Sequence, residues 1–290
     1  MMREYVIMTD SCCDLPPQLA EELGVVVQPM TLFLGEDSFL NYLDGRQLGF
    51  HDFYERLRGG AMPTTSSISV GEFEDLFRSA LQEGKDVLYL CFSSGMSTTY
   101  QSACIAAEEL RGEFPGADIR IVDTLAASLG QGMLVYLCAK QKAAGKTLDE
   151  VAAYAEGTKL NVAHWVTVDD LNHLKRGGRI NATTAMVGSM LAIKPIIHVD
   201  NEGHLINVGK ARGRKAALKT VVDEMEKRLL NHDGPVFISH GDCEADALSV
   251  AADIKARFGM ETQVINYIGP VIGSHSGAGT IALFFIGKER

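Results

Sequence analysis

Short runs of β-forming residues alternate with segments of helical period along most of this 290-residue chain. In the first half, helical segments follow the predicted strands "YVIM", "VVVQPMTLFL", "DVLYLCF" and "DIRIVDT". In the second half, the predicted strand "KPIIHV" is joined to "LINVGK" by the turn "DNEGH". This alternation is typical of α/β layers in which the strands are largely parallel. The sequence therefore predicts an α/β fold.

The length of the chain indicates two domains, because 290 residues exceed the usual size of one domain. The pattern of strands and helices restarts near Asn161. We predict an N-terminal α/β domain over residues 1–160 with a mainly parallel sheet. We predict a C-terminal α/β domain over residues 161–290 with a mixed sheet. One large α/β domain is the alternative.

Two helix starts carry the signature of a capping box, in which a hydroxyl residue is followed three positions later by Glu. These pairs are Ser69 with Glu72 and Thr147 with Glu150. A further helix is predicted over "ATTAMVGSML" at residues 182–191.

Composition and charge exclude several classes of protein. With 46% hydrophobic and 22% charged residues, the chain has the composition of a globular protein. A formal net charge of -10 argues against broad attraction to nucleic acid or to anionic membranes. The apolar segments are too short or too interrupted for stable membrane insertion, and the first residues do not resemble a signal peptide. We expect a cytoplasmic protein.

Four loops rich in hydroxyl groups or glycine lie beside predicted strands and helices. They are "TDSCCD", "PTTSSIS", "SSGMST" and "GPVIGSHSGAGT". Ligands of α/β sheets gather beyond the carboxyl ends of strands, where backbone NH groups at helix starts favour anionic oxygens. The loops therefore predict a site for a carboxylate or a phosphate. The alternative is that these Ser and Thr residues only cap helices.

Neither a nucleotide nor a metal ion is expected as a cofactor. "AAGKT" has the end of a phosphate-binding loop, but Lys140 occupies the position of its first glycine. "GSHSGAGT" lacks the spacing of a dinucleotide-binding motif. His240, Asp242 and Cys243 are too close in sequence to converge easily on one ion, and we interpret Asp242 as a helix cap.

"GMSTT" partly matches the nucleophile elbow of serine hydrolases, with Ser97 at the nucleophile position and Thr99 in place of the last glycine. His275 follows Ser97 in the chain order that a triad of this type requires. A serine hydrolase or esterase that uses Ser97 and His275 is therefore the alternative function.

Two segments concentrate positive charge in this acidic protein. They are "LKRGGRI" at Leu174–Ile180 and "KARGRKAALK" at Lys210–Lys219. Guanidinium groups recognise phosphate and carboxylate through paired donors, so these segments could bind a phosphorylated product or an acidic partner. The alternative is that they are solvated helix ends.

Six ordered motifs resemble the DegV family, the fatty-acid-binding proteins of bacteria. They are "TDSCCDLP", "PTTSSIS", "SSGMSTTYQSA", "LKRGGRI", "KARGRKAAL" and "GPVIGSHSGAGT", and they span the whole chain. The resemblance implies a two-domain α/β protein that binds one long-chain fatty acid and carries no other cofactor. It implies a substrate carrier, in which a separate fatty acid kinase phosphorylates the bound carboxylate with ATP.

The resemblance also implies roles for five residues. Thr65, Ser97 and His275 are expected to hold the carboxylate, while the acyl tail is buried in an apolar tunnel. Arg179 and Arg212 match basic positions that support the interaction with the kinase subunit.

This chain departs from the family pattern in two of the motifs. Thr98 stands where the family usually has glycine after the serine of "GMST", which could alter the shape of the pocket. "TSSIS" at residues 65–69 replaces the usual Thr-Ser-Gln-Pro-Ser.

Neutral hydroxyl donors can hold a carboxylate without burying an opposing charge.

Overall fold

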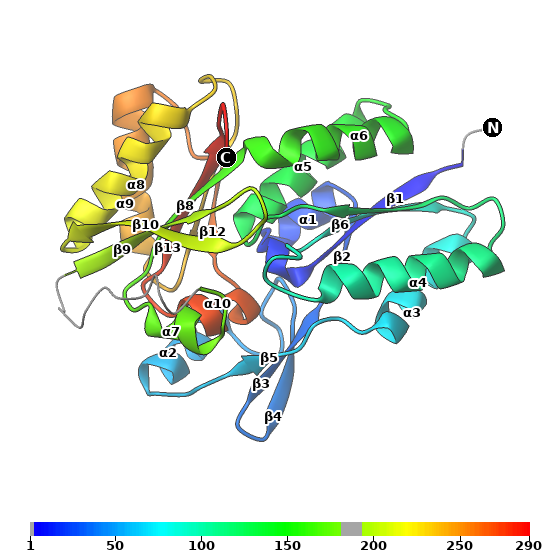
Figure 1. Cartoon of the computed structure of the whole chain (residues 1–290), viewed down its shortest axis with the longest axis horizontal. Coiled ribbons are helices and arrows are strands. Elements are labelled where there is room, and N and C mark those ends of the chain that lie inside the picture. The colour runs from blue at the N-terminus through cyan, green and yellow to red at the C-terminus, as the bar shows by residue number, and fades with distance from the viewer. Residues whose placement is uncertain (1–2, 181–192) are drawn as a thin grey trace.

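The computed structural model describes residues 3–180 and 193–290, whose strands form three sheets (Figure 1). A four-stranded parallel sheet has the order β2-β1-β6-β7, and a six-stranded mixed sheet has the order β10-β9-β8-β13-β11-β12. A small antiparallel sheet has the order β4-β3-β5. The predicted parallel and mixed sheets are confirmed. A domain boundary near residue 160 stays a prediction, and the helix expected at 182–191 lies outside the described residues.

The parallel sheet is covered by helices on both faces, as its apolar strands require. Its strands are β1 (Tyr5–Asp10), β2 (Val25–Gln28), β6 (Asp86–Cys91) and β7 (Ile119–Asp123). The helices α3 (Val70–Gln82) and α4 (Thr99–Glu113) pack on one face. The helices α1 (Pro17–Glu22), α5 (Leu129–Ala143) and α6 (Leu148–Thr158) pack on the other. The core around α5 also includes Phe237 and Phe284 of the mixed sheet, so α5 joins the two sheets.

The mixed sheet is antiparallel except where β11 pairs with β12. Its strands are β8 (Val162–Thr167), β9 (Ile193–Val199), β10 (Leu205–Arg212), β11 (Val236–His240), β12 (Val264–Tyr267) and β13 (Ile281–Ile286). The helices α8 (Arg214–Arg228) and α9 (Glu244–Phe258) cover one face, beside the sheet in Figure 1. The opposite face is left for α5 and for the site described below.

A smaller layer lies below the two large sheets in Figure 1. It contains β3 (Met30–Leu34), β4 (Asp37–Asn41), β5 (Thr64–Thr65), α2 (Phe50–Arg58), α7 (Asn172–Arg176) and α10 (Pro270–Ser276). Two single turns, Ser11–Cys13 and Lys159–Asn161, complete the elements of the described chain. Tyr54 of α2 is buried and donates a hydrogen bond of 2.8 Å to the carbonyl of Ile268, just before α10. This bond links α2 to the segment that leads into α10.

Both predicted capping boxes are confirmed. The side chains of Ser69 and Thr147 accept from the backbone NH of Glu72 and Glu150, whose carboxylates bind back to the cap residues. Each pair satisfies two backbone donors at a helix start.

Three other local predictions are wrong. "VVVQPMTLFL" forms two strands in different sheets, since Pro29 lacks the NH that a continuous ladder needs. "GPVIGSHSGAGT" is not all loop, because Pro270 fits the first turn of α10. Asp242 does not cap α9. Its backbone is left-handed (φ 56°), and its carboxylate pairs with Arg58 and His51 instead.

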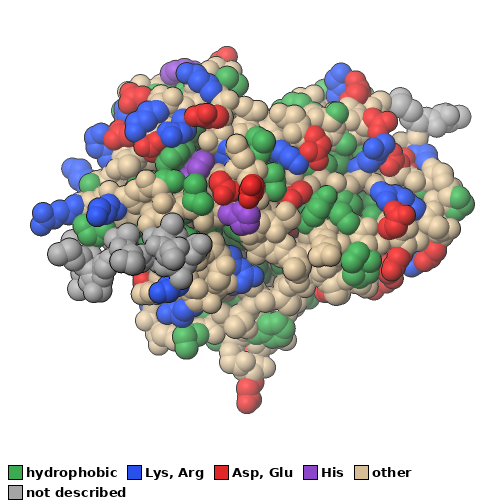
Figure 2. Space-filling model, in the orientation of Figure 1, with side chains coloured by type: hydrophobic (Ala, Val, Ile, Leu, Met, Phe, Trp, Pro, Cys, Tyr) green, Lys and Arg blue, Asp and Glu red, His purple; other side chains and the backbone are tan. Residues whose placement is uncertain are grey.

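In the described ranges, every helix is too short or too polar to cross a bilayer. Figure 2 shows acidic and basic side chains interspersed on the face in view.

Candidate functional site

A cavity of about 540 Å³ lies against the open face of the mixed sheet. Ligand cavities in proteins measure roughly 300–1,000 Å³, so this cavity can hold a small molecule. Alternate residues of β8, β9 and β13 line it, as expected when one face of a sheet forms a wall. The apolar residues of this wall are Val166, Val168, Ile197, Val199, Ala282 and Phe284.

The wall also contains His164, which has a neutral imidazole. Its Nδ1 donates to the carbonyl of Val162 at 2.8 Å, and its ring packs edge-on to Phe284. Burial, and secondarily the charge of Arg290, lower the pKa of His164 well below its ordinary value. We did not predict this residue, although its alternation with Val166 and Val168 along "VAHWVTV" was a readable signal.

Thr65, Ser97 and His275 all line this same cavity. Thr65 ends the short strand β5, Ser97 lies in the turn before α4, and His275 lies on α10. The hydroxyl of Thr65 and Nε2 of His275 are hydrogen-bonded at 2.9 Å, although the two residues are 210 positions apart in sequence. The fold thus brings the three predicted residues to one space.

Ser97 is placed at the start of α4 by its own hydrogen bonds. Its hydroxyl accepts from the backbone NH of Thr99 at 3.2 Å and is shared with the Thr99 hydroxyl at 2.8 Å. The NH of Thr99 occupies a lone pair of the Ser97 oxygen and not its proton. The hydroxyl proton of Ser97 can therefore turn towards a ligand.

Thr98 does not strain the turn in which it replaces the usual glycine. Its backbone (φ -81°, ψ 0°) is accessible to any residue. Its hydroxyl donates to that of Ser67 at 3.0 Å. The substitution therefore ties the "SSGMST" loop to the "PTTSSIS" loop.

His275 is neutral at neutral pH. Burial, and secondarily the charge of Arg179, lower its pKa to about 4. The Nδ1 edge of the ring packs against Gly177, where a Cβ would overlap with Nδ1. The close approach of the "GGRI" turn thus fixes the orientation of the imidazole.

The two arginines assigned to partner contact occupy different places. Arg179 is half-buried and lines the cavity, where Nε donates to the carbonyl of Met96 at 3.2 Å and Nη1 donates to the carbonyl of Gly177. Arg212 is exposed at the end of β10 and borders a separate surface groove. A role for either residue in partner binding stays a prediction.

The "TDSCCD" loop does not line the cavity. Its two carboxylates are buried and bind within the protein. That of Asp10 accepts from the backbone NH of Cys12 and of Phe92, both at 3.0 Å. That of Asp14 accepts from the Ser128 hydroxyl at 2.5 Å and the Gly269 NH at 2.9 Å.

The geometry does not favour the hydrolase alternative. The Ser97 hydroxyl is bonded to Thr99 and the His275 imidazole to Thr65, so the two do not form a nucleophile–base pair. In a catalytic triad, a carboxylate accepts a hydrogen bond from Nδ1 of the histidine. Here Gly177, which has no carboxylate, packs against Nδ1 of His275.

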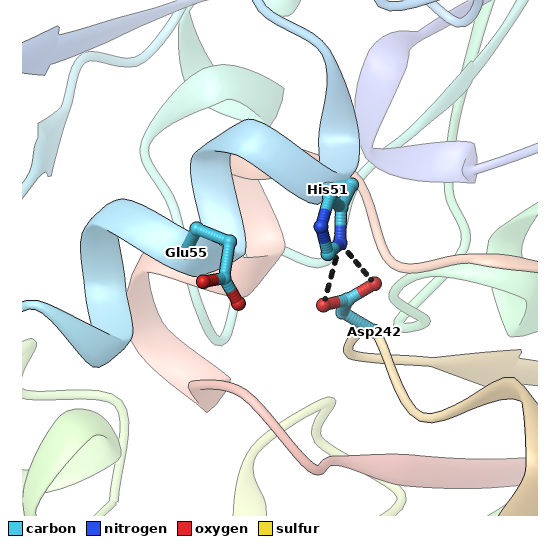
Figure 3. A group of neighbouring side chains, drawn as sticks. All are labelled: His51, Glu55 and Asp242. Carbon is cyan, nitrogen blue, oxygen red and sulfur yellow. Dashed lines mark hydrogen bonds and ion pairs between the residues drawn. The ribbon is translucent and has the colours of Figure 1, made fainter.

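The candidate metal ligands are also paired internally. Cys243 donates its backbone NH to Nδ1 of His240 at 3.3 Å, whereas Asp242 points to α2. Figure 3 shows Asp242 beside His51, with Glu55 one turn along the helix. The guanidinium of Arg58 forms ion pairs with the carboxylates of both Glu55 and Asp242, so an arginine supplies the positive charge between them.

An apolar cavity with convergent polar groups is the usual form of a small-molecule site, here in an α/β protein. The sequence profile of the DegV family matches residues 4–288. The chain belongs to the DegV family. A DegV domain-containing protein of Clostridium perfringens is 44% identical over 290 residues, which cover 100% of this chain and 99% of the relative.

Solved structures of the family have the same fold. The DegV family protein of Thermus thermophilus, described as binding fatty acid, matches with a TM-score of 0.87 and 31% identity. That match covers 98% of this chain and 99% of the other. DegV of Bacillus subtilis, described as a fatty acid binding protein, matches with a TM-score of 0.83 and 27% identity over 99% of this chain and 100% of the other.

Proposed function

We propose that this protein binds a long-chain fatty acid, with the carboxylate at Thr65, Ser97 and His275. One observation carries the proposal: these three residues and the apolar face of the mixed sheet line a single cavity. The descriptions of the related structures from Thermus thermophilus and Bacillus subtilis support the same ligand class.

The energetics assign different roles to the two ends of the ligand. Burial of an acyl tail contributes about 0.8 kcal/mol per CH2, so the apolar wall supplies most of the affinity. Hydroxyl and imidazole donors satisfy the carboxylate oxygens and fix the orientation of the chain. Since His275 is neutral, the only charge that the described cavity lining provides near the carboxylate is that of Arg179.

The substitution Ser97→Ala tests the head-group assignment. It removes one hydrogen bond to a charged group, which is worth about 1.5–3 kcal/mol, so we expect binding to weaken at least about tenfold. Displacement of a fluorescent fatty acid by palmitate measures this affinity. Ser102→Ala, further along α4 and outside the cavity lining, is the matched control. Equal affinities of wild type and Ser97→Ala would contradict the assignment.

We further propose that the bound fatty acid is presented to a separate fatty acid kinase. In that reaction a carboxylate oxygen attacks the γ-phosphorus of ATP, and ADP leaves. This protein positions the carboxylate but contributes no nucleophile. The family resemblance and the exposed cation of Arg212 support the proposal.

Arg212→Ala tests the kinase contact, since this residue does not line the cavity. We expect unchanged palmitate affinity and slower acyl phosphate formation with ATP and a DegV-associated kinase subunit. The exposed Arg56→Ala on α2 is the control. Equal phosphorylation rates for the Arg212 and Arg56 variants would argue against this surface.

A further inference from the structure

A second, smaller hollow of about 280 Å³ adjoins the head-group end of the cavity. Thr65, Arg179 and His275 line both spaces, so the hydrogen-bonded pair of Thr65 and His275 stands between them. His173 and Arg176 of α7 line only the hollow. We call this space the basic hollow.

The basic hollow has two guanidinium groups and no carboxylate among its described lining residues. Neither Arg176 nor Arg179 forms an ion pair with a described acidic residue, whereas Arg214 and Arg257, for example, both do. Nη2 of Arg176 is bonded to Nδ1 of His173 at 3.1 Å. In a protein of net charge -10, two cations therefore line one space with no counter-charge among the described residues.

The two imidazoles beside these guanidinium groups carry no positive charge at neutral pH. Burial and the charge of Arg176 lower the pKa of His173, as burial and Arg179 lower that of His275. Both rings are therefore neutral at neutral pH. His173 accepts from Arg176 and so directs that guanidinium along the wall of the hollow.

The wall of the basic hollow is formed by close packing between α7 and α10. Gly177 lies against Nδ1 of His275, and a Cβ on Gly277 would lie 2.7 Å from Cδ2 of His173. Gly277 also has a φ of 83°, which other residues rarely adopt. Each glycine thus lets the imidazole of the facing helix approach the backbone.

We propose that the basic hollow is a phosphate-class subsite that takes the phosphoryl group of an acyl phosphate. The assignment rests on the proposed fatty acid binding. An acyl phosphate differs from the fatty acid by one phosphoryl group, joined to a carboxylate oxygen. With that carboxylate at Thr65 and His275, the added dianion extends into the adjoining hollow, where Arg176 and Arg179 match phosphate oxygens through paired donors.

Arg176→Gln tests this subsite with a stable analogue of palmitoyl phosphate, in which a methylene group replaces the bridging oxygen. Displacement of a fluorescent fatty acid gives the affinities of the analogue and of palmitate. We expect Arg176→Gln to weaken the analogue about tenfold, as for the loss of one charge-assisted contact, and to leave palmitate within about twofold. Arg176→Lys should recover part of the loss, because it restores charge but not the paired donors.

Lys175→Gln is the matched control, since Lys175 is an exposed cation on the same helix that does not line the hollow. Equal losses of analogue affinity in the Lys175 and Arg176 variants would overturn the subsite, and so would an analogue affinity that Arg176→Gln leaves unchanged. If the wild type fails to bind palmitate, the proposed fatty acid function fails. If the wild type binds palmitate but not the analogue, only the subsite fails.

Discussion

At the scale of single residues, the site depends on neutral donors next to one cation. His275 is held neutral by burial and by Arg179, so it can bind a carboxylate oxygen only as a hydrogen-bond partner. Thr65 orients the ring from one side and Gly177 packs against the other. Small hydroxyl residues leave space in the cavity at the loops "PTTSSIS" and "SSGMST", as the proposed carboxylate site requires.

The lowered pKa of His275 predicts acid sensitivity of the ligand-free protein. The folded-state pKa of about 4 lies below the ordinary value of 6.5, so the unfolded chain binds the proton more readily. The stabilising contribution of the neutral ring is complete above about pH 6.5 and is lost as the pH falls towards 4. It amounts to about 3 kcal/mol at most.

Urea unfolding of wild type and His275→Gln at pH 7 and at pH 4.5 measures this contribution. The free energy of unfolding should fall more steeply with acidification in the wild type than in His275→Gln. Burial raises the pKa of Asp14 to about 7, so acidification increases the contribution of Asp14 to the free energy of unfolding. This effect opposes that of His275 and is present in both proteins, so the comparison with the variant removes it. Parallel losses in both proteins would contradict the pKa assigned to His275.

At the scale of elements, much of the fold could be predicted from periodicity and caps. The strands that precede α4 and α5 and the capping boxes at Ser69 and Thr147 were readable because each depends on local sequence. The helix α10 was missed, since its glycine and serine residues lack an apolar period and Pro270 is its main local signal. Its position depends on tertiary contacts with Tyr54 and the α7 turn.

Gly177→Ala tests whether the α7 turn positions His275. The backbone of Gly177 has an ordinary helical φ (-69°), so alanine is locally tolerated, but its Cβ would overlap with Nδ1 of His275. We expect palmitate affinity to fall about tenfold through displacement of the ring. Gly112→Ala, where a Cβ would meet open space, should leave binding unchanged. Wild-type affinity in Gly177→Ala would show that the turn does not hold the imidazole.

At the scale of the whole molecule, hydrogen bonds across the chain hold the two large sheets around the cavity. Ser128, at the start of α5, bonds both to Asp14 and to the hydroxyl of Ser239 in β11 at 2.9 Å. The Asp14 carboxylate in turn accepts from Gly269 at the start of α10. The side chain of Arg290 is buried and donates to backbone carbonyls, including those of Lys159 and Leu125.

The cavity itself could not be predicted from the sequence by local rules. Its wall comes from alternate positions of three strands, and its polar groups come from the distant loops of Thr65, Ser97 and His275. Sequence motifs identified the polar residues through the family resemblance. They could not place Arg179 in the cavity wall, because the "GGRI" turn meets α10 only in the folded chain.

Mass spectrometry of the protein purified under native conditions from bacterial cells tests the central claim most directly. If the cavity between the sheets binds a fatty acid as proposed, each protein molecule carries one long-chain fatty acid. Denaturation should release this fatty acid for detection. Substitution of Ser97 with alanine should lower this occupancy. A wild-type protein that carries no acyl chain, and takes none up when incubated with palmitate, would contradict the account.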